Sequence, residues 1–133
     1  LKYAQIIQPA HINSGYIRYE RHRVWEIEGE LKPGQRHIYQ KRTFFIDEDT
    51  WQIALADHYD ARGELWRVST AYQMNFYNDL VPWMTAEATH DLQSRRYLLS
   101  GLSNEVKREA SFGHEALRQD FKPDALRRLG GKN

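Results

Sequence analysis

The chain has 133 residues with a hydrophobic fraction of 41%, which suits one domain, residues 1–133, with a modest core. Its formal net charge of +1 at pH 7 lacks the basic excess that nucleic-acid binding requires, so no nucleic acid is expected as a partner. Cysteine is absent, which excludes disulfides, thiolate metal sites and cysteine nucleophiles, and no apolar run approaches the roughly 20 residues of a membrane-spanning helix.

The first 20 residues carry little pattern, and Pro9 and Gly15 predict an irregular or edge segment there. Alternation of apolar and polar residues, together with a high aromatic content, then predicts β-strands. Polar turns separate these strands at residues 32–35, 47–50 and 60–63. The predicted strands cover residues 21–31, 36–46, 51–59 and 64–76, followed by two weaker strands at 83–90 and 96–102.

The end of the chain has a different character. Residues 121–129 predict a short helix, with Pro123 in its first turn and two arginines near its end. Residues 130–133 are rich in glycine and are expected to fray. The expected fold is therefore all-β with a minor helical part: a curved antiparallel meander with a short C-terminal helix.

Strand register can be estimated from the turns. Centring the first hairpin on Pro33 and Gly34 places Glu26 opposite Lys41, Glu30 opposite His37 and Trp25 opposite Arg42. Centring the third turn on Arg62 places Asp57 opposite Arg67 and His58 opposite Trp66. The resulting alternation collects apolar side chains on one face: Trp25, Ile27, Leu31, Ile38, Phe44, Ile46, Trp51, Ile53, Leu55, Tyr59 and Leu65.

The same register brings Arg42, Asp57 and Arg67 together on that apolar face. One interpretation is a polar anchor for a carboxylate or phosphate head group inside a hydrophobic cavity. The other is an internal salt-bridge network that fixes the strands and binds nothing. The candidate ligand-binding residues are Trp25, Ile27, Ile38, Arg42, Phe44, Trp51, Ile53, Leu55, Asp57 and Arg67. Trp51→Ala is expected to destabilise the fold by about 3 to 5 kcal/mol if the side chain is fully buried.

The sequence gives little support for a metal site or for catalysis. The turn Asp47-Glu48-Asp49 could bind a cation but lacks the spacing and glycine of a calcium loop, so a solvated turn is expected. Alternation sends Asp57 and His58 to opposite faces, which disfavours a dyad. No nucleophile elbow or phosphate-cradling loop is present. We therefore expect no catalytic residues, no metal and no cofactor, and a protein that is not an enzyme.

Several motifs of the chain are specific enough to compare with a known family: Lys41-Arg42, the run Phe44 to Trp51, Asp57-x-Tyr59-Asp60-x-x-Gly63-x-Leu65-Trp66-Arg67, Val81-Pro82-Trp83 and Phe121-x-Pro123-x-x-Leu126-Arg127-Arg128. With these motifs the chain resembles domain-of-unknown-function family 1329 of Gram-negative bacteria, over nearly the whole chain but only the C-terminal part of a family member. The resemblance implies a relationship to the lipoprotein carriers LolA and LolB, with their unclosed barrel. It also implies a periplasmic setting, peripheral to the membrane, and a transporter or lipoprotein partner.

The apolar face and the family resemblance together leave two candidate functions, one of ligand binding and one of protein interaction. The first is a non-enzymatic periplasmic module that binds a hydrophobic ligand, a lipid or an acyl chain, on the apolar face. The second is a structural or interaction module whose apolar face is covered by an N-terminal part of the family protein or by another copy. Unpaired strand edges also predict a homodimer through those edges or through the apolar face.

Overall fold

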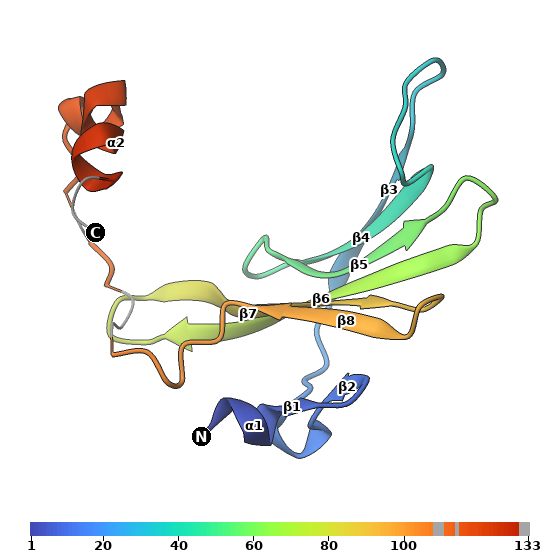
Figure 1. Ribbon diagram of the computed structural model, residues 1–133, viewed down its shortest axis with the longest axis horizontal. Coiled ribbons are helices and arrows are strands. Elements are labelled where there is room, and N and C mark those ends of the chain that lie inside the picture. Colours follow the sequence, from blue (N-terminus) through green and yellow to red (C-terminus); the bar gives the residue numbers. More distant parts are fainter. Residues whose placement is uncertain (108–110, 114, 131–133) are drawn as a thin grey trace.

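The computed structural model describes residues 1–107, 111–113 and 115–130. Its centre is a six-stranded antiparallel sheet in which sequence neighbours pair in the order β3-β4-β5-β6-β7-β8. The two outer strands, β3 and β8, do not pair with each other, so the curved sheet stays unclosed (Figure 1). The strands are β3 (Val24–Glu30), β4 (Lys41–Asp47), β5 (Ile53–Tyr59), β6 (Leu65–Phe76), β7 (Val81–Asp91) and β8 (Arg96–Ser100). This meander confirms the fold class predicted from the sequence.

The predicted turns are confirmed by their backbone geometry. Gly34 has φ 79° and Gly63 has φ 78°, the left-handed conformation that favours glycine. The Gln35 N–H donates to the Lys32 carbonyl at 3.1 Å, which closes the first turn. Pairing beyond that turn starts later than expected, because residues 31–40 form a long loop closed by the Leu31 N–H bond to the Gln40 carbonyl at 2.9 Å.

This loop makes the predicted register of the first hairpin wrong. Glu26 lies opposite Phe45, four positions from the predicted Lys41, and Trp25 lies opposite Ile46. His37 lies in the loop, so it does not pair with Glu30, which lies opposite Lys41. Because side chains alternate with a period of two, a shift of four positions leaves every residue of β3 and β4 on its predicted face.

Three β-bulges interrupt the sheet, and the two in β5 and β6 decide which face the site residues occupy. The first interrupts β5 between Ile53 and Leu55, and the second interrupts β6 between Leu65 and Arg67. Each bulge inserts one extra residue, Ala54 or Trp66, and so reverses the alternation that follows it. We call the face carrying Ile27, Arg42, Phe44, His58 and Arg67 the site face, and the opposite face the core face.

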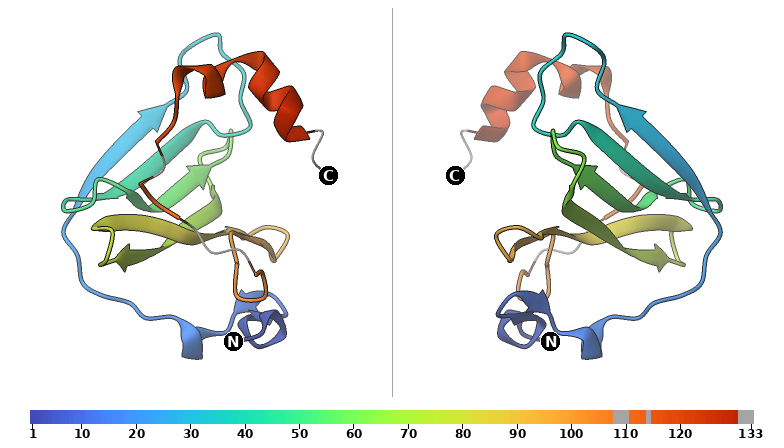
Figure 2. Two further views of the ribbon diagram at one scale, coloured as in Figure 1. Left: turned by 90° about the vertical axis from the view of Figure 1, so that its left-hand side faces the viewer. Right: turned by 90° about the vertical axis from the view of Figure 1, so that its right-hand side faces the viewer.

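The N-terminal segment supplies much of the small core. It contains α1 (Tyr3–Ile6), β1 (Ile7–Gln8), β2 (His11–Ile12) and the 3-10 helix η1 (Ser14–Tyr16). Ile6 and Ile12 are buried against Ala88 of β7, which has no exposed surface. Figures 1 and 2 show these elements beside β7 and β8. The segment is therefore more ordered than the irregular or edge segment predicted from the sequence, and it covers part of the core face.

The predicted C-terminal helix is confirmed as α2 (Pro123–Gly130), preceded by the 3-10 helix η2 (Arg118–Phe121). Figure 1 shows α2 standing apart from the sheet, so it leaves the site face open. Gly130 is the last residue of α2, and the fraying expected for residues 131–133 lies outside the described residues. None of the described helices is long and apolar enough to cross a membrane.

Candidate functional site

A row of directly paired residues crosses the whole sheet on the site face. Each strand contributes one position, and the row contains three arginines and one aspartate. Its members, from β3 to β8, are Gly29, Arg42, His58, Arg67, Asp91 and Arg96. The sheet therefore gathers charged side chains from distant parts of the chain into one polar row.

Asp91 organises one end of this polar row. Its Oδ2 accepts hydrogen bonds from Trp66 Nε1 at 2.9 Å and from Arg67 Nε at 3.0 Å. Its Oδ1 accepts the backbone N–H of Ser94 at 2.8 Å. The bond from Ser94, and then those from Arg67 and Trp66, lower the pKa of Asp91 to about 2. Asp91 is therefore ionised near neutral pH and neutralises Arg67.

Tyr39, from the loop before β4, lies over the middle of the row. Its ring stacks on His58 with the ring centroids 4.6 Å apart, and its hydroxyl accepts a hydrogen bond from Arg67 Nη1 at 2.8 Å. The Arg42 guanidinium lies 5.2 Å from the centroid of the same ring. Tyr39 therefore contacts both arginines and holds them around His58 through aromatic and cation–π contacts.

His58 is held as a largely neutral imidazole. Burial lowers its pKa, and the positive charges of Arg42 and Arg67 lower it further. Its Nε2 lies 3.1 Å from Ser69 Oγ, which in turn lies 2.8 Å from Thr89 Oγ1. Nδ1 is buried and has no hydrogen-bond partner among the described residues.

Arg42 differs from Arg67 in its partners. Its Nη2 lies 3.1 Å from His37 Nε2 and 3.3 Å from His37 Nδ1, so the guanidinium lies against the His37 ring. Within the described parts of the chain, no carboxylate comes within ion-pair distance of Arg42. The half-buried Arg42 is thus a cation without a charged partner on the site face.

An apolar hollow adjoins the polar row. Its volume is about 270 Å³ and it is open to solvent, close to the lower end of the roughly 300 to 1,000 Å³ of small-molecule sites. Three of the exposed apolar side chains on this face, Trp25, Ile27 and Ile53, have exposed fractions of 53%, 47% and 46%. The hollow is lined by Phe44, Ile53, Ala54, Leu55, Ala56, His58, Ser69, Ala71, Met84 and Glu87.

Six of the ten predicted ligand-binding residues share the site face: Trp25, Ile27, Arg42, Phe44, Ile53 and Arg67. The predicted partnership of Asp57 with Arg67 is wrong, because Asp57 pairs with Val68 on the core face. The bulge at Ala54 moved Asp57 to that face, and the bulge at Trp66 returned Arg67 to the site face. His58 therefore stands between the two arginines where Asp57 was expected.

The other predicted residues lie elsewhere. Leu55 pairs with Phe45 and Thr70 on the core face, although it also borders the hollow. Ile38 lies in the loop before β4 and is 57% exposed. Trp51 lies between β4 and β5 with φ 58°, and 73% of its surface is exposed. The condition of full burial behind the large expected effect of Trp51→Ala is therefore not met.

Sequence reasoning missed His58 and Asp91 as members of the polar row, and Tyr39 and Trp66 as residues that contact it. Trp66 was assigned to the opposite face by simple alternation, whereas the bulge lets both Trp66 and Arg67 reach Asp91. The left-handed Gly63 indicates a bulge beside the turn, but no residue pattern places one at Trp66.

Comparison with known proteins places this architecture in a family. The family model described as a protein of unknown function, DUF1329, matches residues 1–127. The chain belongs to the DUF1329 family. An uncharacterized protein of Pseudomonas aeruginosa is 51% identical over 130 residues, which is 98% of this chain. The chain spans 29% of that relative's length. The resemblance stated from the motifs is confirmed.

Two solved structures are similar to this DUF1329 chain over 77% of its length. One, from Vibrio parahaemolyticus, is described as an outer membrane lipoprotein-sorting protein domain; the TM-score is 0.46, the identity 15% and the covered share of that chain 41%. The other is a DUF1329 family protein from Desulfovibrio piger, with a TM-score of 0.49, an identity of 19% and a covered share of 40%.

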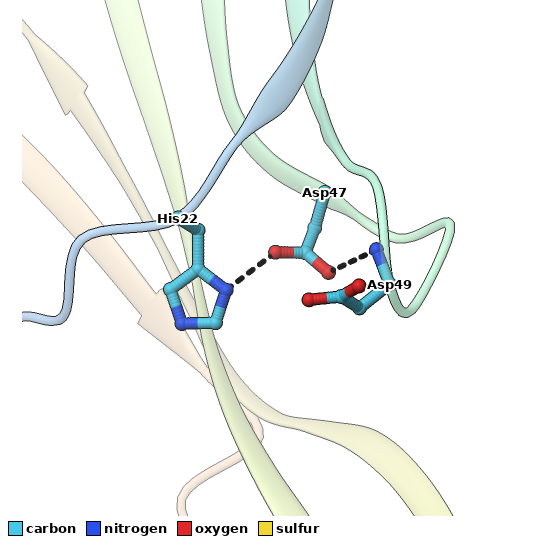
Figure 3. A group of neighbouring side chains, drawn as sticks. All are labelled: His22, Asp47 and Asp49. Carbon is cyan, nitrogen blue, oxygen red and sulfur yellow. Dashed lines mark hydrogen bonds and ion pairs between the residues drawn. The ribbon is translucent and has the colours of Figure 1, made fainter.

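A second cluster of the DUF1329 chain consists of His22, Asp47 and Asp49 (Figure 3). His22 Nδ1 lies 2.7 Å from Asp47 Oδ2, and Asp47 Oδ1 accepts the backbone N–H groups of Asp49 and Thr50 at 3.1 and 2.8 Å. Burial opposes ionisation of Asp47, but these backbone hydrogen bonds hold its pKa below the ordinary value. The turn was expected to be solvated, whereas Asp47 is only 3% exposed and both of its oxygens have protein partners. The cluster therefore fastens the segment before β3 to the turn after β4.

Proposed function

We propose that this DUF1329 chain is a non-catalytic binding module of the periplasm that holds a hydrophobic ligand, a lipid or an acyl chain, on its site face. The observation behind the proposal is the exposed apolar surface around the hollow, where Trp25, Ile27 and Ile53 remain about half exposed. Contiguous apolar surface of this kind marks a binding surface more often than plain solvent-facing structure. The resemblance to the LolA and LolB carriers supports the periplasmic setting and a role beside lipoprotein sorting or an efflux-type transporter.

The alternative, a module whose site face is covered by another part of the family protein or by another copy, also accounts for the exposed surface. Pairing of two copies through the free edge of β3 is disfavoured, because Glu26, Glu28 and Glu30 would bring like charges together. Face-to-face pairing would have to bury the polar row, including the unpaired Arg42. Both arguments favour a ligand with a small polar group over a second copy.

Binding of a neutral acyl probe tests the proposal without involving the arginines. A fluorescently labelled monoacylglycerol is expected to bind the protein, and Ala71→Trp is expected to abolish binding by filling the hollow, which Ala71 lines. Glu26→Trp is the matched control, because it adds the same side chain to an exposed position of β3 on the other face. The proposal would be contradicted if no probe bound and if native mass spectra showed no co-purified lipid. A dimer in sedimentation experiments would then favour the alternative, in which a second copy covers the site face.

A further inference from the structure

The charges of the polar row indicate which head group the ligand carries, an inference that rests on the proposed ligand-binding function. Arg67 is already neutralised by Asp91 at 3.0 Å, and it also contacts the Tyr39 hydroxyl and the Trp66 ring. Among the described residues, Arg42 contacts the rings of His37 and Tyr39 and no carboxylate. A half-buried guanidinium without a counter-charge is unfavourable by itself and gains most from an anion that reaches it.

The residues around Arg42 also indicate how the ligand is oriented on the site face. Phe44 lies two residues along β4 on the same face, and its partner across the sheet is Ala56; both line the hollow. An anionic group at Arg42 would therefore sit at the end of an apolar path that leads through Phe44 and Ala56 toward Ala71. A hollow of about 270 Å³ suits a single flexible chain better than a bulky ring system.

We infer that the site face binds a single-chain amphiphile with a carboxylate head, the head on Arg42 and the tail in the hollow. A carboxylate matches one guanidinium fork in both charge and geometry. A phosphate monoester carries a charge of about −1.5 to −2 at pH 7, which exceeds the single charge of Arg42. The carboxylate of Glu87, which lines the hollow, would repel this excess negative charge. A carboxylate head and a phosphate head are both oxyanions that a guanidinium can bind, and the experiment below distinguishes between them.

Calorimetric titration with decanoate, decyl phosphate and decanol, each at concentrations where it is dissolved as single molecules, tests this inference. Decanoate is expected to bind at least about tenfold more tightly than decanol, because a hydrogen bond between charged groups is added. Arg42→Gln is expected to reduce decanoate affinity to about that of decanol, and a urea unfolding curve with an unchanged m-value shows that the variant is folded. Arg42→Lys keeps the charge without the fork and is expected to bind decanoate with intermediate affinity.

Lys41→Gln is the matched control. Lys41 is the neighbouring cation on the same strand, but it lies on the core face and pairs with Glu28 at 2.9 Å. Its loss removes the same charge from the chain and is expected to leave decanoate affinity unchanged. Equal losses in the Lys41 and Arg42 variants, or equal affinity for decanoate and decanol, would overturn the inference while the proposed function stands. If decyl phosphate bound more tightly than decanoate, the assignment of a carboxylate head would be wrong. If none of the three probes bound, the proposed function would be contradicted as well.

Discussion

Gly101 offers a sharp test of how the chain leaves the sheet after β8. Its φ is 83°, and a Cβ placed on it would lie 2.7 Å from the Thr85 carbonyl oxygen and 3.1 Å from the Ala86 Cα. Both are backbone atoms of β7, so neither can move aside like a side chain. This close approach lets Leu102 pack on the core, where its carbonyl accepts a hydrogen bond from the Tyr3 hydroxyl at 3.2 Å.

Gly34 provides the matched comparison. Its φ of 79° is nearly the same, yet a Cβ there would meet nothing within 4 Å. Replacing either glycine by alanine places an L-residue in the left-handed region, which costs about 1 to 2 kcal/mol, and changes the unfolded chain equally. Only Gly101→Ala adds a clash, worth about 1 to 3 kcal/mol by analogy with overpacked cores.

The free energy of unfolding, measured in urea at constant m-value, is therefore expected to fall by about 1 to 3 kcal/mol more for Gly101→Ala than for Gly34→Ala. Losses that agree to within about 0.5 kcal/mol would contradict the close approach of residue 101 to β7, since surface differences usually stay in that range.

Four further expectations follow from the structure. Ile12→Ala should lower the free energy of unfolding by about 2 to 4 kcal/mol in urea titration, because Ile12 is buried in the core with Ala88. Trp51→Gly should leave that free energy unchanged or raise it, because Trp51 is 73% exposed at φ 58°; a large loss would contradict its position. The pKa of Asp91 is lowered to about 2, so its contribution to stability is present above about pH 4 and is lost as the pH falls toward 2. In Asp91→Asn the midpoint of thermal unfolding should therefore fall less steeply between pH 4 and pH 2 than it does in the unchanged protein. The pKa of His58 is lowered by burial and by the charge of Arg42, so folding is weakened as the pH falls below the ordinary histidine value. Arg42→Gln should raise that pKa in an NMR titration, and an unchanged value would place Arg42 away from His58.

Local signals in the sequence predicted the strands and most turns. Alternation and glycines such as Gly34 and Gly63 act within a few residues, where backbone sterics decide the conformation. The faces of β3 and β4 were also predictable, although the register was four positions off, because an even shift preserves alternation. Arg42 and Phe44 could therefore be placed correctly on an apolar face from the sequence by itself.

The tertiary structure alone decided which residues surround Arg42. Whether Ala54 and Trp66 are bulged depends on the hydrogen-bond ladders with neighbouring strands, and alternation within one strand carries no record of them. These two extra residues moved Asp57 away, brought His58 between the arginines and set Trp66 beside Asp91. The sequence thus determined that a charged group would stand on an apolar sheet face, and the long-range pairing determined that this group, the half-buried Arg42, has no ion-pair partner among the described residues.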